Sequence, residues 1–288
     1  MSELANEKLA NNSDNFCYRH PDRQSFVLCQ RCGRTICSAC QTQAAVGVHC
    51  PECVKEARQN APRQRPFAVR TGRAIRSGSG MPVVTYTLIA LCVVIYAAQL
   101  VSGGAVTEAL LYYPPLTAIQ PWTLVTAIFI HGSPLHLLSN MFSLFILGRI
   151  LEPVIGWRRY LALFLVSGLG GSVAVLLVAP GIAVLGASGA IFGMLAALFI
   201  ILRRMGQNTT QIVVLIALNL ALGFLFPGMV AWQAHVGGLI VGGLIALVYA
   251  RTANVRQRRV QVMLVGAIVV VLLVITVVAV ALQRVLHS

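Results

Sequence analysis

Residues 160–203 read YLALFLVSGLGGSVAVLLVAPGIAVLGASGAIFGMLAALFIILR, and this stretch decides the fold class. It contains two apolar runs, 160–179 and 187–203, joined by a short segment rich in proline and glycine. No charged residue precedes Arg203. Because a helix needs about 20 mostly apolar residues to cross the hydrocarbon core of a bilayer, the stretch predicts two consecutive membrane-spanning helices.

The same pattern extends over most of the chain. Of the 288 residues, 57% are hydrophobic and 10% are charged, whereas a soluble domain has about 25% charged residues. Continuous apolar runs also exclude an outer-membrane barrel, whose strands alternate over about ten residues. We therefore predict an all-α polytopic membrane protein with seven spans, at 82–102, 134–153, 160–179, 187–203, 210–226, 231–250 and 260–283.

The basic residues fall in alternate loops. Lys and Arg number 22 against eight acidic residues, a net charge of +14. Most of them lie before the first span or in the loops after the second, fourth and sixth spans, and the loops between carry none. Because cytoplasmic loops are enriched in basic residues, we predict a multi-pass plasma-membrane protein with a cytoplasmic N-terminus and an external C-terminus. This placement explains the charge without a nucleic-acid partner.

The N-terminal part of the chain differs in composition. Residues 1–16 are polar and are expected to be disordered, 17–53 hold seven of the eight cysteines, and 54–80 form a basic, flexible linker. The membrane core is predicted over 81–252, and 253–288 add the seventh span with a short tail. Because residues 1–16 do not resemble a signal peptide, the Cys-x2-Cys pairs indicate metal binding rather than disulfides.

Four ligand pairs with two-residue gaps occupy the cysteine-rich segment. Two pairs fill one tetrahedral Zn2+ site, so eight ligands predict about two structural ions with no open coordination position. Interleaved pairing places one ion at Cys17, His20, Cys37 and Cys40 and the other at Cys29, Cys32, Cys50 and Cys53. His49 is an alternative to Cys50, with a longer gap to Cys53. The pattern resembles a B-box-type zinc finger, which implies a binding module with a protein partner.

Three clusters of polar residues interrupt the membrane half. They read HGSPLHLLSN at 131–140, GASGAIFG at 186–193 and AHVGGLIVG at 234–242. Ionisable and nucleophilic groups inside spans are costly and usually functional. All three clusters lie toward the predicted outer ends of their spans, so they are expected at one depth in the membrane.

The side chains in these clusters fit the parts of a hydrolytic site. Ser188 offers a nucleophile at a helix N-terminus, where the backbone favours a developing oxyanion. His235 offers a base, and His136 and Asn140 share one helix face as oxyanion donors. GxxxG pairs allow close helix approach, at Gly189 and Gly193 and at Gly238 and Gly242. Each feature alone is explained more simply by packing, but their shared depth favours a Ser–His dyad.

Taken together and in this order, the three motifs are similar to those of the rhomboid family of intramembrane serine proteases. The resemblance covers about residues 82–250 and implies a six-helix core, to which 260–283 adds a seventh helix. It implies Ser188 as nucleophile and His235 as base. It also implies supporting residues at His131, His136 and Asn140 and an aromatic ring against the catalytic imidazole at Phe192. One departure is Trp122-Thr123, where the family has a Trp-Arg pair.

These observations predict a serine endopeptidase that cleaves single-span membrane proteins near the outer membrane face, with no cofactor for catalysis. The alternative is a catalytically silent relative that binds or escorts membrane proteins, and the intact Ser188 and His235 argue against it. A transporter or channel using intramembrane histidines would show inverted repeats or buried acidic residues, and we expect neither.

Overall fold

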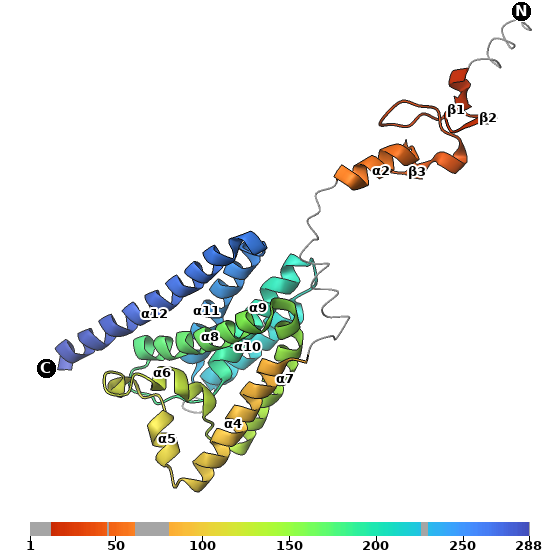
Figure 1. The fold of residues 1–288 in the computed structure, drawn as a ribbon. Helices are drawn as coiled ribbons and strands as arrows, with labels where there is room; N and C mark the ends of the chain where they lie inside the picture. Colours follow the sequence, from red (N-terminus) through yellow and green to blue (C-terminus); the bar gives the residue numbers. More distant parts are fainter. Residues whose placement is uncertain (1–12, 45, 61–80, 226–229, 288) are drawn as a thin grey trace, which may run out of the picture. The chain divides into compact units, whose positions relative to one another are not determined.

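The structure, a computed structural model, describes residues 13–44, 46–60, 81–225 and 230–287. The chain divides into two compact units, Met1–Arg65 and Pro66–Ser288, and each is described by itself (Figure 1). The first contains η1 (Ser13–Asn15), β1 (Phe16–Cys17), β2 (His20–Gln24), η2 (Ser38–Cys40), β3 (Thr42–Gln43), β4 (Val48–His49) and α2 (Pro51–Asn60). Strands β1 and β2 pair antiparallel, as do β3 and β4. The described core of this unit is built mainly from its cysteines.

Two boundaries of the first unit differ from the sequence prediction. Residues 13–16 are not disordered, because the Asn15 carbonyl accepts a hydrogen bond from the Ser25 N–H at 2.9 Å. Helix α2 continues seven residues into the predicted linker, because Arg31 donates to the Cys53 carbonyl and forms an ion pair with Glu56. The rest of these two segments, 1–12 and 61–80, lies outside the described residues.

The second unit is helical, which confirms the predicted all-α polytopic fold. Its helices are α4 (Val83–Val101), α5 (Ala105–Leu110), α6 (Thr123–Thr126), α7 (Pro134–Ile155), α8 (Trp157–Val178), α9 (Ser188–Arg204), α10 (Thr210–Leu225), α11 (Trp232–Arg251) and α12 (Arg258–His287). In the described part of the chain, α4, α7, α8, α11 and α12 are long and apolar enough to cross a membrane. The predicted fourth and fifth spans are shorter helices, with 17 residues in α9 and 16 in α10.

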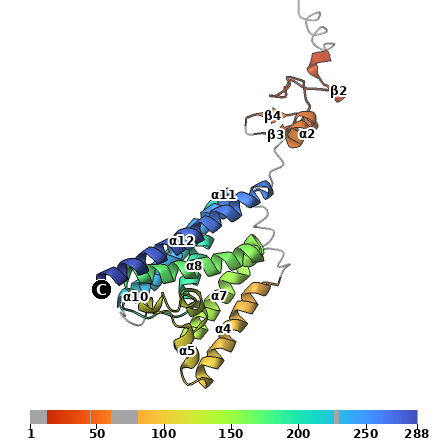
Figure 2. The same ribbon diagram turned by 60° about the vertical axis from the view of Figure 1, so that its left-hand side comes forward.

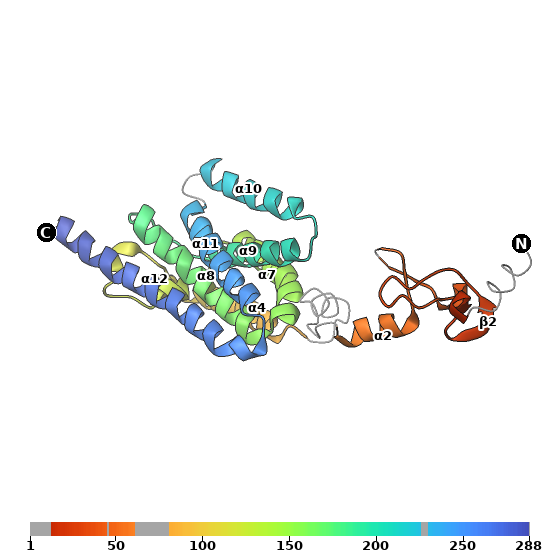
Figure 3. The ribbon, with the colours of Figure 1, turned by 90° about the horizontal axis from the view of Figure 1, so that it is seen from above.

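Helices α8, α9 and α11 pack against one another at the centre of this unit (Figure 1). Figure 2 shows α12 alongside α8. Helix α4 packs on α7, and α7 contacts both α8 and α9. Helices α10 and α12 lie on opposite sides of the central group (Figure 3). Polar contacts join α12 to α8 near both ends, from Arg159 to Gln261 at 2.6 Å and from Gln283 to the Leu176 carbonyl at 3.3 Å. The seventh helix is therefore packed into the membrane unit.

The connection between α4 and α7 fixes the backbone that precedes α9. It contains α5, η3 (Pro114–Leu116), α6 and η4 (Ala127–Phe129). Tyr112 and Val184 exchange two backbone hydrogen bonds of 3.2 and 2.8 Å, and the Gly186 N–H donates to the Ala127 carbonyl at 2.8 Å. A segment distant in sequence thus positions the residues directly before Ser188.

Glu152 is a buried acidic residue in α7, which corrects the expectation that the spans contain none. Its carboxylate accepts hydrogen bonds from the backbone N–H groups of Val84 and Thr85, at 2.9 and 2.8 Å, and from the Thr85 hydroxyl at 2.7 Å. The first N–H groups of a helix have no intrahelical acceptor, and a negative charge there is favoured by the helix dipole. Glu152 therefore caps α4 from a neighbouring helix, a structural role.

We expect Glu152→Ala to lower the midpoint of thermal unfolding in detergent strongly. It leaves buried N–H groups of α4 unpaired, and hydrogen bonds to a charged group contribute about 1.5–3 kcal/mol each. Glu152→Gln retains an acceptor oxygen and should cost less. Glu108→Ala, at an exposed position of α5, is the matched control and should leave the midpoint unchanged. Equal midpoints for Glu152→Ala and the control would contradict the capping role.

Candidate active site and metal centres

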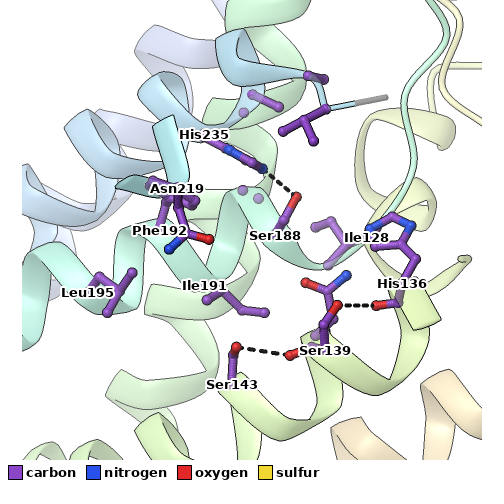
Figure 4. Close-up of a pocket in the computed structure, with 18 of the residues that line it drawn as sticks. Ile128, His136, Ser139, Ser143, Ser188, Ile191, Phe192, Leu195, Asn219 and His235 are labelled. Carbon is purple, nitrogen blue, oxygen red and sulfur yellow. Dashed lines mark hydrogen bonds between the residues drawn. The ribbon is translucent and has the colours of Figure 1, made fainter. Parts of the chain in front are cut away.

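Ser188 and His235 come from the first turns of different helices and meet inside the membrane unit. Ser188 is the first residue of α9, and His235 lies in the first turn of α11. The Ser188 Oγ and His235 Nε2 atoms are 2.9 Å apart (Figure 4). Phe192 stacks on the imidazole, with 4.2 Å between ring centroids and 12° between ring planes. The hydroxyl and the imidazole have the separation that a nucleophile and its base require.

Glycines set the close approach of α9 and α11. A Cβ on Gly238 would overlap the carbonyl group of Gly189, and a Cβ on Gly242 would overlap the backbone of Gly193. The two GxxxG faces predicted from the sequence therefore contact each other directly. Their missing side chains let the helix backbones touch, and this contact brings the hydroxyl and the imidazole within hydrogen-bond distance.

His136 and Asn140 approach the same site from α7. The Ser133 hydroxyl accepts a hydrogen bond from the His136 N–H at 3.1 Å and caps α7. Gly186 has a φ of +113°, and a Cβ there would lie 2.7 Å from His136 Nε2, so the position suits only glycine. Asn140 is buried, and its Nδ2 has no hydrogen-bond partner among the described residues. A buried donor without an acceptor is available to an oxygen atom of a bound molecule.

His131 packs against His136. It is buried, and its ring meets the His136 ring edge-on with 5.2 Å between centroids. Gln99 of α4 holds its backbone, accepting from the His131 N–H at 3.0 Å and donating to the His131 carbonyl at 3.3 Å. This position suits a residue that orients His136 rather than one that contacts the reacting atoms.

A cavity of about 420 Å³ surrounds the Ser188 hydroxyl and extends between α7, α9 and α10. Most of its surface is apolar, as in sites that bind organic ligands. Its polar side chains include His136, Ser139, Asn140, Ser143, Ser188, Asn219 and His235. The Ser188 hydroxyl is thus reached through a largely apolar space within the helical unit.

Two clusters of potential metal ligands lie in the first unit. They are Cys17, His20, Cys37 and Cys40, and Cys29, Cys32, Cys50 and Cys53, with the ligand atoms of each cluster within 4.8 Å of one another. The Cys40 Sγ lies 3.4 Å from His20 Nδ1, and the Cys32 and Cys50 Sγ atoms are 3.7 Å apart. Tetrahedral bonds of about 2.3 Å give sulfur separations of about 3.8 Å. Each cluster could therefore hold a metal ion, and the two sets match the interleaved pairs expected from the sequence.

The thiols of the two clusters have shifted pKa values, upward at Cys40 and Cys53 and downward at Cys17 and Cys29, where burial is outweighed by backbone hydrogen bonds. Burial, together with the neighbouring Cys17 and Cys37 sulfurs, raises the pKa of Cys40 to about 11. Burial and the nearby Cys50 sulfur raise the pKa of Cys53 to about 12. Several thiolates this close repel one another unless a positive ion lies between them, and a coordinating ion deprotonates its thiols.

The sequence analysis did not predict the roles of three polar residues of the membrane unit. Glu152 caps α4, Gln99 holds the backbone of His131, and Asn219 of α10 lines the cavity. All three lie in predicted spans, so the cost of polar groups in a membrane could have identified them as candidates. Their partners depend on which helices are neighbours, and sequence spacing does not reveal that.

Comparisons with known proteins relate part of the membrane unit to rhomboid proteins. The Rhomboid domain family matches residues 118–252. Rhomboid protease GluP of Bacillus subtilis (strain 168) is 34% identical over 175 residues, which cover 57% of this chain and 34% of that protein. RHOMBOID-like protein 5 of Arabidopsis thaliana is 39% identical over 141 residues, 45% of this chain and 44% of that protein.

Rhomboid protease AarA of Providencia stuartii is 26% identical over 231 residues, which cover 66% of this chain and 79% of that protein. The chain spans less than half the length of GluP and of RHOMBOID-like protein 5. The matched residues 118–252 lie within the membrane unit, so these comparisons support a relationship between that unit and the rhomboid family. The matched range of the domain family does not include the first unit.

We expect Gly238→Ala to separate α9 from α11 and to weaken the Ser188–His235 contact, because the added methyl group would overlap the Gly189 carbonyl. Overpacking of this kind costs about 1–3 kcal/mol. The labelling rate of Ser188 by a fluorophosphonate, measured with the unfolding midpoint, should fall at least about tenfold. Gly243→Ala is the control, because its Cβ would lie 3.8 Å from the nearest side chain. Equal labelling of both variants would contradict the packing argument.

Proposed function

We propose that the protein is an intramembrane serine endopeptidase of the rhomboid type. The observation that carries the proposal is the 2.9 Å contact between the Ser188 hydroxyl and the His235 imidazole inside a cavity of the helical unit. Similarity to two proteins named rhomboid proteases supports the same activity. The proposed substrates are single-span membrane proteins cleaved near the outer face of the plasma membrane, with the N-terminus of the enzyme in the cytoplasm.

The first step of the proposed reaction uses the dyad alone. Ser188 Oγ attacks the carbonyl carbon of the scissile peptide bond, and its proton passes to His235 Nε2. The other ring nitrogen of His235, Nδ1, has no hydrogen-bond partner among the described residues. The stacked ring of Phe192 therefore orients the imidazole in place of the acidic residue of a triad.

The negative oxygen of the tetrahedral intermediate needs hydrogen-bond donors at fixed positions. The start of α9 offers backbone N–H groups that have no intrahelical acceptor, and α7 offers Asn140 Nδ2 and the His136 imidazole. When the intermediate collapses, the C–N bond breaks and the leaving amine takes the proton from His235. Water, deprotonated by the same imidazole, then hydrolyses the acyl-enzyme, so the reaction as written needs no cofactor.

A catalytically silent protein that binds or escorts membrane proteins is the less favoured alternative. Such a protein does not need a nucleophile and a base at hydrogen-bond distance. Here the Ser188–His235 contact and the unpartnered Asn140 donor occur in one cavity, and both are accounted for by catalysis.

For the first unit we propose a B-box-like module that binds two structural Zn2+ ions. The two ligand clusters, with separations suited to tetrahedral coordination, support this reading. A unit of this size has too little apolar core to be stable alone, and metal binding supplies folding free energy. With four protein ligands each, the ions leave no position for catalytic water, so the module is proposed to bind a protein partner.

We expect Ser188→Ala and His235→Ala each to abolish cleavage of a transmembrane substrate by the purified protein in detergent. Nucleophile and base act as one unit, so the double variant should be no worse than either single variant. Unfolding midpoints serve as the control for folding. Normal cleavage by folded Ser188→Ala would falsify the assignment, and clearly additive losses from a residual rate would argue against a shared dyad.

We expect the full-length protein to contain about two zinc ions per chain, measured by mass spectrometry of the metal. Cys29→Ser should reduce the content to about one ion, because it removes a ligand from one cluster only. Cys92→Ser is the matched control, since this cysteine lies in α4, and it should retain two ions. A content of about one zinc ion per chain in the unmodified protein would contradict the assignment of all eight residues as zinc ligands.

A further inference from the structure

Two pairs of adjacent arginines occupy the starts of α8 and α12. Arg158 and Arg159 are the second and third residues of α8, and Arg258 and Arg259 are the first two residues of α12. The helix dipole favours anions at this end of a helix and cations at the other end. Arginines at these positions therefore do not stabilise the two helices by themselves, and their charge requires another explanation.

Helices α8 and α12 bring the two pairs together because they run parallel and in register. At their starts, Arg159 Nε donates to Gln261 Oε1 at 2.6 Å, and toward their far ends Gln283 donates to the Leu176 carbonyl at 3.3 Å. Figure 3 shows the two helices side by side. Arg258 lies three residues before Gln261 and so shares the face of α12 that meets α8. The starts of α8 and α12 thus form one positively charged surface.

The membrane unit offers this surface no acidic partner. Residues 81–288 contain ten arginines and two acidic side chains. Glu152 is buried and bonded to the start of α4, and Glu108 lies in α5. Arg158, Arg258 and Arg259 are exposed. Their charge is therefore available to an anion from outside the unit.

The position of the cluster relative to the bilayer indicates which anion this is. Both helices are long and apolar enough to cross a membrane, so their first turns lie near its surface. Trp157 is exposed, and Arg158 lies over its ring at 4.9 Å from the centroid; tryptophan is enriched at the membrane–water interface. Exposed apolar side chains follow the arginines on α12, among them Val262 and Met263. A charged surface directly next to an apolar one matches a phospholipid rather than a soluble anion.

We propose that the starts of α8 and α12 form a binding site for an anionic phospholipid of the surrounding bilayer, whose phosphate group is held by Arg158, Arg258 and Arg259. Guanidinium groups bind phosphate oxygens through paired, charge-assisted hydrogen bonds, and basic residues next to spanning helices attract anionic headgroups. One phosphate then links the first turns of both helices. The inference does not depend on the protease function, because the site lies on the seam between α8 and α12 and not in the cavity of Ser188.

The general enrichment of basic residues in cytoplasmic loops explains the charge of this face but not its concentration on one seam. That enrichment concerns the loops as a whole, and Arg149 of α7 and Arg203 of α9 contribute to it equally. Both are exposed, and Arg149 lies over the ring of Phe145, which contacts Tyr86 of α4. These two arginines therefore provide a matched control of equal charge away from the seam.

The test titrates the purified full-length protein, in micelles of a non-ionic detergent, with fluorescent phosphatidylglycerol. Phosphatidylcholine with the same acyl chains and fluorophore is the comparison, because its headgroup is zwitterionic. Each basic residue at an anionic surface contributes roughly a factor of five to binding. We therefore expect phosphatidylglycerol to bind at least about tenfold more tightly than phosphatidylcholine.

Variants locate the site. R158Q/R258Q should weaken the binding of phosphatidylglycerol at least about tenfold and leave the binding of phosphatidylcholine unchanged, because two contributions of roughly a factor of five are lost. R158K/R258K keeps the charge and R149Q/R203Q is the matched control, so both should stay within about threefold of the unmodified protein. If R158Q/R258Q does not fold, R259Q provides a second measurement, with an expected loss of about fivefold.

Three results would overturn the proposal. The first is equal affinity for the two lipids, and the second is an R158Q/R258Q or R259Q variant that retains the affinity for phosphatidylglycerol. The third is an equal loss in R158Q/R258Q and R149Q/R203Q, which would indicate general attraction to the charged face instead of a site on the seam. Inorganic phosphate in large excess should not displace the bound lipid, and displacement would show that the site binds a free anion instead.

Discussion

The direct backbone contact between α9 and α11 is the constraint on which the rest of the membrane unit depends. Membrane helices are not driven together by a hydrophobic effect, so close packing and hydrogen bonds hold them. Gly189 and Gly238 meet without side chains between them, and Gly170 and Gly237 make a similar contact between α8 and α11. The Ser188–His235 distance follows from this packing, so a single added methyl group would act on stability and on the site together.

Polar groups in the membrane unit fall into two sets. Glu152 and Gln99 have partners on neighbouring helices and loops, and they fix α4 to α7 and to the backbone before α7. The Asn140 Nδ2 atom is buried beside the cavity and has no hydrogen-bond partner among the described residues. Because an unsatisfied polar group is costly in a membrane, the first set stabilises the fold and the second is available to a ligand.

The two units of the chain differ in what stabilises their folds. The membrane unit buries a large apolar core around α8, α9 and α11. In the described part of the first unit, the buried cluster consists of cysteines and Ile36, with Tyr18 and Val48 packed on it. A metal ion at each ligand cluster would supply what so small an apolar core cannot, and in this proposal the module is separate from the chemistry of Ser188.

The sequence alone determined the fold class, the approximate spans and the residue types of the site, because these depend on local composition and short spacings. The apolar runs predicted the helices, and the GxxxG pairs predicted the contact faces. The Cys-x2-Cys and Cys-x2-His pairs predicted the candidate metal ligands. Tertiary structure decided that residues 13–16 are ordered, that α2 continues past Cys53, and that Glu152 caps α4. It also decided that Asn219 faces the cavity. Each of these depends on a partner distant in the chain, and a helical pattern specifies which face is polar but not which neighbour that face will meet.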